Sequence, residues 1–193
     1  MAMAGTIPRP FNISSQGAPA VGADIIDALV WGQNAYGGTT QVITIAQSVN
    51  GAGLLWNPAG SGVSILMYGL QISANATSGT SFTPVTTTFG TTTAGLSGFS
   101  VSGTGSANKQ TLTLPAVAKT PTGLIYQNVS LGAYAYNPIK TQFVTNNNGF
   151  IQFFGGFANT VLRPNSGIVV VLAAPTGGLT AAVSFDWVEY AVT

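Results

Sequence analysis

The sequence of 193 residues predicts an all-β protein, a single jelly-roll-like β-sandwich that follows an extended N-terminal arm. Three observations lead to this fold class. Apolar and polar residues alternate in short segments, Gly, Asn and Pro pairs separate those segments, and β-branched Thr is abundant in them. We expect residues 1–38 to form the arm and residues 39–193 to form the sandwich domain.

The predicted arm is set apart by its composition. Pro8, Pro10 and Pro19 lie among Gly and Ser residues, which suits an extended segment better than a packed element. At most one short helix is expected within it, with Asp24 as its N-terminal cap and Gly32 at its end. The apolar stripe of that helix must pack on something. It either closes the end of its own domain or reaches a neighbouring subunit, and the sequence leaves both readings open.

Alternation predicts the strands of the sandwich. In Gln41–Val49, Ile43 and Ile45 lie on one face of the strand and Thr44 on the other. Turn pairs divide the domain into about eight or nine short strands, a number that favours a sandwich or barrel and, among sandwiches, a jelly roll. The candidate segments for these strands, in addition to Gln41–Val49, are Val63–Ser73, Ser81–Thr93, Gly98–Val101, Gln110–Leu114, Leu124–Ala135, Thr141–Thr145, Phe150–Phe157, Ile168–Ala174 and Leu179–Val192.

The last predicted strand has the most regular alternation of the chain. Its apolar face is expected to lie in the core, with Trp187 as the largest side chain. The residues predicted on that face are Leu179, Ala181, Val183, Phe185 and Trp187.

Ionisable chemistry is scarce throughout the chain. It has five basic and four acidic residues, no His and no Cys, and only 5% of its residues are charged, against about a quarter in an ordinary soluble domain. A Ser-His-Asp triad, a Cys-His pair and the usual zinc sites are therefore excluded. The five cations form no cluster, so we expect no nucleic-acid partner. No apolar run is long enough for a transmembrane helix, so we expect no membrane partner either.

The four carboxylates do not form a recognisable catalytic pair. Asp24 and Asp27 have the spacing of a helix cap and a first-turn acid, whereas Asp186 and Glu189 are predicted on opposite faces of one strand. We therefore expect no catalytic, cofactor-binding or metal-binding residues, and no enzymatic activity. A chain with so few surface charges is weakly protected against self-association, which favours a place inside an assembly.

Aromatic side chains are the remaining candidates for binding. Tyr134 and Tyr136 flank one predicted strand, and exposed aromatic rings bind sugars and are frequent in protein interfaces. Phe153 and Phe154 are adjacent, so they point to opposite faces of their strand, and one of them is expected to face an interface. Most of the aromatic residues are expected in the core.

Two segments of the chain resemble a known family. LLWNPAGSGV (54–63), with the strand that follows it, resembles a turn-then-strand segment of small virion proteins of tailed bacteriophages. Residues 161–190, with a Pro-containing turn, a Val-rich strand and the ending Trp187-Val188-Glu189, resemble the closing part of the same proteins. The resemblance implies a jelly-roll-like component of the capsid, a decoration (cement) protein, and a homotrimer.

The functional expectation combines both lines of reasoning. We expect a non-enzymatic virion protein that is made in the host cytoplasm and stabilises the capsid surface by binding the major capsid protein. Its binding residues are expected in the arm and at the adjacent phenylalanines. The alternative is a receptor- or glycan-binding module of a head fibre or tail component, with Tyr134 and Tyr136 as glycan-binding residues. The candidate partner-binding residues are Pro8, Pro10, Phe11, Ile13, Phe153 and Phe154.

Overall fold

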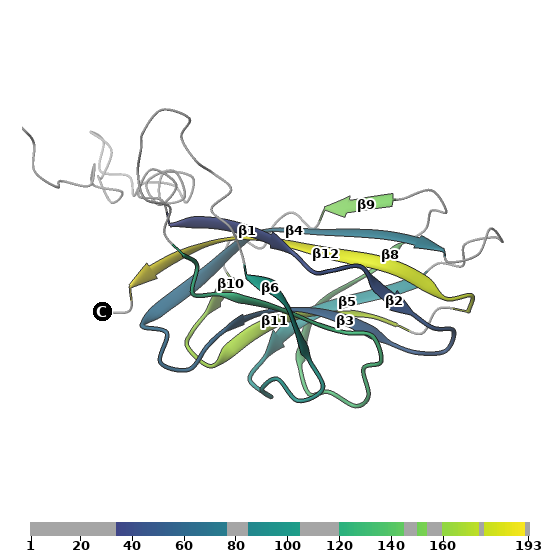
Figure 1. Ribbon diagram of the computed structural model, residues 1–193, viewed down its shortest axis with the longest axis horizontal. Coiled ribbons are helices and arrows are strands. Elements are labelled where there is room, and N and C mark those ends of the chain that lie inside the picture. Colours follow the sequence, from purple (N-terminus) through teal and green to yellow (C-terminus); the bar gives the residue numbers. More distant parts are fainter. Residues whose placement is uncertain are drawn as a thin grey trace, which may run out of the picture.

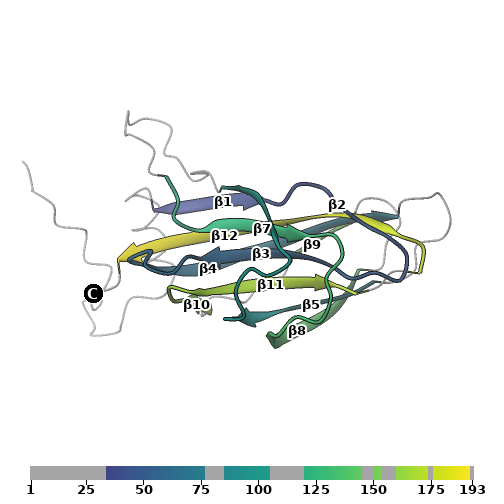
Figure 2. The ribbon, with the colours of Figure 1, turned by 60° about the horizontal axis from the view of Figure 1, so that its bottom comes forward.

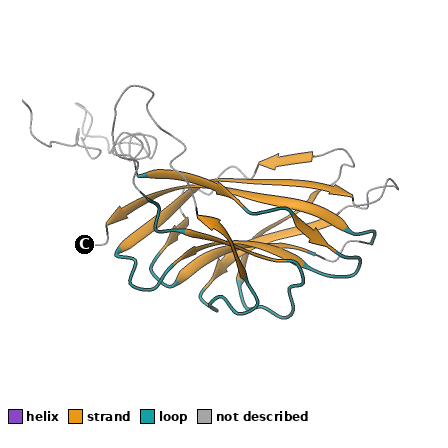
Figure 3. Ribbon diagram, in the orientation of Figure 1, coloured by secondary structure: helices purple, strands orange, loops and turns teal. Residues whose placement is uncertain are grey.

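Two antiparallel β-sheets face each other in the computed structural model of the protein (Figure 1). Every element of regular secondary structure within the described ranges is a β-strand (Figure 3). The predicted all-β sandwich is therefore confirmed. The structure describes residues 34–76, 85–104, 120–144, 150–153, 160–173 and 176–191.

The first sheet, called sheet 1 here, is built around two long strands. β12 lies between β1 and β4, and β10 follows β4; β2 also pairs with β12, and β9 also pairs with β4. β12 and β4 are paired from Leu179 opposite Ala76 to Ala191 opposite Val63. The strands of sheet 1 are β1 (Ala35–Thr39), β2 (Ile43–Ile45), β4 (Val63–Ala76), β9 (Phe150–Phe153), β10 (Thr160–Leu162) and β12 (Leu179–Ala191).

The second sheet, called sheet 2, has the order β6-β7-β3-β11-β5-β8. Its strands run in nearly the same direction as those of sheet 1 (Figure 2), which is the arrangement of an aligned sandwich. The strands of sheet 2 are β3 (Gly51–Asn57), β5 (Val85–Thr92), β6 (Ser100–Thr104), β7 (Leu124–Asn128), β8 (Asn137–Val144) and β11 (Ser166–Leu172).

The alternation predicted for the last strand is confirmed in β12. Its five apolar residues from Leu179 to Trp187 are buried between the sheets, and the residues between them are half-buried. Trp187 is completely buried, and its ring centroid lies 6.0 Å from that of Tyr36 on β1. Trp187 is therefore the core anchor that the sequence predicted.

The central strands of sheet 2, β3 and β11, are buried on both faces. Leu55 and Ile168 point toward sheet 1, while Leu54, Trp56 and Val169 belong to a second apolar cluster on the opposite face. Loops cover that outer face, and Figure 3 shows them gathered below sheet 2. Leu96, Phe99, Tyr134 and Tyr136 of these loops pack on the second cluster. We call it the outer layer.

Three strands were not predicted from the sequence. Four of the five residues of β1 lie inside the range assigned to the arm, so sheet 1 includes residues from Ala35. β3 is buried at all seven residues and therefore lacks alternation, and β10 has only three residues. The strand predicted from 124 to 135 is too long: β7 ends at Asn128, because the following residues cross the outer face of sheet 2 instead of pairing within it.

Several predictions fall on residues that the structure does not describe. The strand β9 ends at Phe153, but the side chain of Phe153 is not described. Outside the described residues lie Pro8, Pro10, Phe11, Ile13 and Phe154, the helix expected between Asp24 and Gly32, and the strand expected at Gln110–Leu114.

Candidate functional site

The buried carboxylate of Glu189 lies at one end of the sandwich core. Glu189 is 5% exposed, and its oxygens accept hydrogen bonds from the backbone N–H groups of Thr122 (2.9 Å) and Gly123 (2.8 Å) and from Trp187 Nε1 (3.0 Å). These donors replace water around the charge, which a buried carboxylate requires. The side chain therefore ties the segment that leads into sheet 2 to β12 of sheet 1.

Asp186 lies on the opposite face of β12 from Glu189, as the alternation predicted, because Glu189 shares its face with Trp187. On the outer face of sheet 1, the charge of Asp186 acts on Tyr68. Burial first, and the negative charge of Asp186 second, raise the pKa of Tyr68 to about 12. The two carboxylates cannot act together on one substrate.

A hollow of about 590 Å³ opens beside Glu189. Tyr36 lines it, and the pKa of Tyr36 is raised by burial and by the nearby charge of Glu189. Asn34, Thr120 and Ala191 also line it, and each is the first or last described residue of its range. The described residues thus form part of its wall, and we place no site there.

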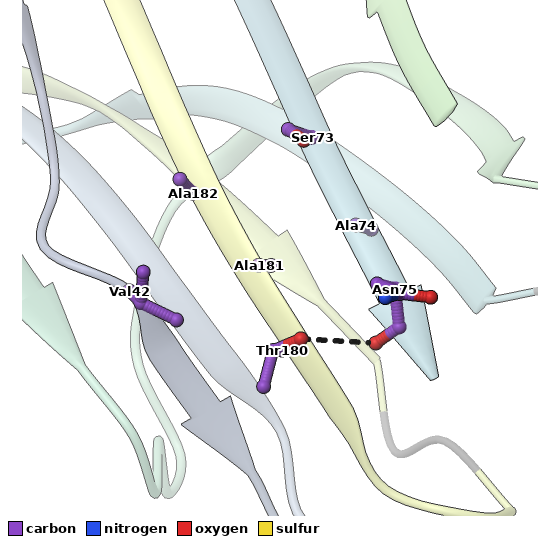
Figure 4. A pocket seen from close by; sticks show the side chains of 7 residues that line it. All are labelled: Val42, Ser73, Ala74, Asn75, Thr180, Ala181 and Ala182. Atoms are coloured by element: carbon purple, nitrogen blue, oxygen red, sulfur yellow. Dashed lines mark hydrogen bonds between the residues drawn. The ribbon is translucent and has the colours of Figure 1, made fainter. Parts of the chain in front are cut away.

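A third region, on sheet 1, is a shallow hollow of about 120 Å³ between β12 and β4 (Figure 4). Its walls are small neutral side chains, and Thr180 Oγ1 donates a hydrogen bond to the backbone oxygen of Asn75 across the two strands (3.3 Å). Val42 closes one side and is 66% exposed. None of the described residues that line it is ionisable or aromatic.

A further surface feature is a groove made of two adjoining hollows, of about 420 and 330 Å³, which share four lining residues. Both are lined by the Thr91–Thr93 segment and by Asn137. Tyr134 and Tyr136 line the first hollow, and the turn from Arg163 to Ser166 lines the second. We call it the Tyr134–Arg163 groove. It unites three segments that lie far apart in the sequence.

Tyr134 is held firmly in its place at one end of the groove. Its hydroxyl donates a hydrogen bond to the Gly95 carbonyl (2.7 Å), and Thr92 Oγ1 lies 3.2 Å from the same hydroxyl. Its ring meets Phe99 edge to face, with 5.1 Å between centroids. The polar end of Tyr134 is thus used inside the protein, and the ring is the part left to contact a ligand.

The other end of the groove is a tight turn that is hydrogen-bonded to the buried Asn57. Pro164 and Asn165 form the turn between β10 and β11, and Asn165 has a positive φ of 64°, the combination of a type II turn. The Asn165 N–H donates to the Asn57 carbonyl (2.8 Å), and the Ser166 hydroxyl donates to the Arg163 carbonyl (2.6 Å). These bonds fix the backbone that presents Arg163 and Asn165.

Asn57 joins the two segments on which the family resemblance depends. Its side-chain Nδ2 donates to the carbonyls of Val63 (2.8 Å) and Leu162 (3.0 Å), and the residue is completely buried. The NPAGSG turn that follows needs Gly60 and Gly62 at positive φ. The two segments, more than a hundred residues apart, therefore meet at Asn57, and each carries a turn with residues at positive φ.

Part of the candidate site was foreseen and part was not. Tyr134 and Tyr136 were predicted as glycan-binding residues, and the structure places both in the groove. Asn137, Arg163 and the Thr91–Thr93 segment were missed, since no signal in the sequence links them. A lone cation in a Pro-Asn turn was the one hint for Arg163.

The comparisons with known proteins add no relative to this description. No protein-family model matches the chain, and no curated protein matches it. Among the described residues, no helix is long and apolar enough to cross a membrane. The same residues contain no group of three or more acidic side chains placed to hold a metal ion.

Proposed function

We propose that this protein is a non-enzymatic structural protein of a bacteriophage virion that binds the major capsid protein and stabilises the shell as a decoration (cement) protein. The observation that supports it is the strand pairing. β1 and β2 pair with β12, β3 with β11, β4 with β9 and β10, and β5 with β8. Strands from the start of the domain thus pair in turn with strands from its end.

This nested pairing supports a jelly roll, a folded-over series of antiparallel pairs that is frequent in viral capsid and lectin domains. In this interpretation β6 and β7 are an addition at the edge of sheet 2, where β7 pairs with β3. The jelly-roll topology, the location in the virion and the homotrimeric state are therefore proposed properties of this protein. The family resemblance around Asn57 supports the first two.

The chemistry of the described residues supports a structural role. The carboxylate of Glu189 is occupied by backbone and indole donors, and Asp186 lies on the other face of β12. Large apolar side chains remain exposed for a partner to cover. They are Val42, Val101, Val129, Ile139, Val161 and Tyr190.

We propose that attachment depends on burial of apolar surface and on backbone pairing by the N-terminal arm, as in β-strand addition. With 5% charged residues, few contacts can be ionic, and salt screens only ionic contacts. The test is binding of the purified protein to capsids that lack it, at low salt and at molar NaCl. Equal occupancy at both concentrations is expected; release at molar salt contradicts this mode of binding.

A variant that lacks residues 1–19 tests the role of the arm. It is expected to fold, as judged by circular dichroism and a cooperative denaturation curve, but to bind capsids more weakly. Loss of folding would show that these residues belong to the core. Native mass spectrometry of the full chain tests the proposed homotrimer, which a purely monomeric spectrum contradicts.

A second candidate function is a receptor- or glycan-binding module of a head fibre or tail component. The Tyr134–Arg163 groove favours it, because aromatic rings and neutral polar side chains converge there. A glycan array distinguishes the two functions, since shell decoration alone requires no sugar binding.

A further inference from the structure

The side chains of the Tyr134–Arg163 groove suit a ligand rich in hydroxyl groups. Thr93 and Asn137 are exposed and Thr91 is half-buried, and their hydroxyl and amide groups can both donate and accept hydrogen bonds. A sugar has the same dual capacity at each hydroxyl. Neutral groups of this kind bind without the desolvation cost of a charge.

The aromatic end of the groove offers the second element of sugar recognition. Because the Tyr134 hydroxyl is bonded to Gly95 and Thr92, its ring cannot swing away from the groove. Tyr136, also half-buried, lines the same hollow. The negative face of an aromatic ring attracts the C–H groups of a pyranose, as it attracts the positive edge of another ring.

Charge narrows the class of ligand. Arg163 is exposed and is the one charged side chain among the residues that line the two hollows. Its planar guanidinium fits a carboxylate or a sulfate through paired N–H donors. No carboxylate lines the described walls to neutralise it.

The groove is also pre-organised. The Phe99 contact and the Gly95 bond hold the aromatic end, and the bond from Asn165 to Asn57 holds the turn beside Arg163. Binding to such a site orders few protein groups, so little of the interaction free energy is lost.

From these observations we propose that the Tyr134–Arg163 groove binds an acidic oligosaccharide, with sugar rings against Tyr134 and Tyr136 and the acidic substituent at Arg163. The inference deepens the second candidate function and rests on it, and it is independent of shell decoration. We favour a sugar over a protein partner because exposed hydroxyl and amide groups lie beside the two aromatic rings in this groove.

The test is an array of neutral, carboxylated and sulfated glycans probed with the full chain, followed by calorimetry on the glycans that bind. The variants are Arg163→Gln and Tyr136→Ala, both at residues with no internal hydrogen bond from the side chain among the described contacts. Matched controls are Lys140→Gln, an exposed cation that does not line the groove, and Tyr190→Ala, an exposed tyrosine elsewhere.

The wild-type protein is expected to bind acidic glycans, and Arg163→Gln to weaken that binding about ten- to a hundredfold, as loss of a charged hydrogen-bonded pair does. Tyr136→Ala should weaken the binding of acidic and of neutral glycans alike. Both control variants should bind glycans as the wild type does. Comparing the affinities of carboxylated and sulfated glycans identifies which acidic group Arg163 binds more tightly.

Other outcomes overturn the proposal at different levels. Groove-dependent binding of neutral glycans alone overturns the acidic class but leaves the second candidate function standing. Binding to no glycan, or binding that survives both groove variants, overturns both. Loss of capsid binding in Arg163→Gln would assign the groove to the shell contact and also overturn the glycan proposal.

Discussion

The two sheets of this sandwich differ in how many of their faces are covered. In sheet 1, β12 alternates between buried and half-buried residues along most of its length. In sheet 2, β3 is buried throughout and β11 nearly so, because the loops of the outer layer cover the face that points away from sheet 1. The core between the sheets is therefore formed by side chains of paired strands. The outer layer is formed where loops pack on the outer face of sheet 2.

The largest effect is expected from comparing Trp187 and Trp56, the buried tryptophans of the described residues. Trp187→Ala removes the anchor of the main core, where paired strands cannot close the cavity, and should cost about 3–5 kcal/mol. Trp56→Ala opens a cavity in the outer layer, where the loops can relax, so its cost should be clearly smaller. Urea denaturation of both variants measures the difference. Equal costs would show that the outer layer is as rigid as the core.

Asn57 tests the junction at which β3, β4 and β10 meet. Asn57→Ala leaves the Leu162 carbonyl without its side-chain donor, whereas the part-buried Val63 carbonyl keeps the Ser61 hydroxyl as a donor, so the cost should be about 1–3 kcal/mol. The Asn57 carbonyl still accepts from Asn165, so the turn beside the groove should persist. The denaturation midpoint measures the cost, and an unchanged midpoint would show that water replaces the lost donor.

Glu189 tests the corresponding junction between β12 and the segment before β7. Glu189→Gln keeps the shape of the side chain and one accepting oxygen but removes the charge. The hydrogen bonds become weaker, so the free energy of unfolding should fall by about 1 kcal/mol.

Gly123→Ala should destabilise the fold more than Glu189→Gln does, because an added methyl would lie 2.9 Å from Ile65 and 3.1 Å from Trp187. A Gly123→Ala variant as stable as the wild type would contradict the close packing described here.

The smallest effect at neutral pH is expected at Tyr68, on the outer face of sheet 1. Its pKa is raised from 10.0 to about 12, so the unfolded chain ionises first, and the free energy of unfolding should fall between pH 10 and 12. Tyr68→Phe should remove that part of the fall. At pH 7 it should not destabilise, since the hydroxyl is buried without a partner among the described residues.

Prediction from the sequence succeeded where a strand alternates between buried and less buried residues, and also at β11, whose apolar run was recognised although the strand is buried on both faces. β12 and β4 were found because their alternation survives, whereas β3 was missed because a strand covered on both faces has no period of two. β1 was hidden because its glycines, Gly37 and Gly38, resemble the composition of the arm.

The candidate site was predictable only in its aromatic part. Tyr134 and Tyr136 stand out in any sequence, but the partners that complete the groove come from other strands, and their convergence depends on the order of the strands in sheet 2. The role of Glu189 was missed for the same reason. Nothing near it in the sequence indicates that the amides of Thr122 and Gly123 will meet its carboxylate.

The central claim, a decoration role on a capsid, is tested most directly by quantitative mass spectrometry of purified virions. The quantity to measure is the copy number of this protein relative to the major capsid protein. Shell-wide decoration predicts a ratio near one or a sizeable fraction of it. A handful of copies per particle would assign the protein to a fibre, vertex or tail, and its absence from virions would contradict the account.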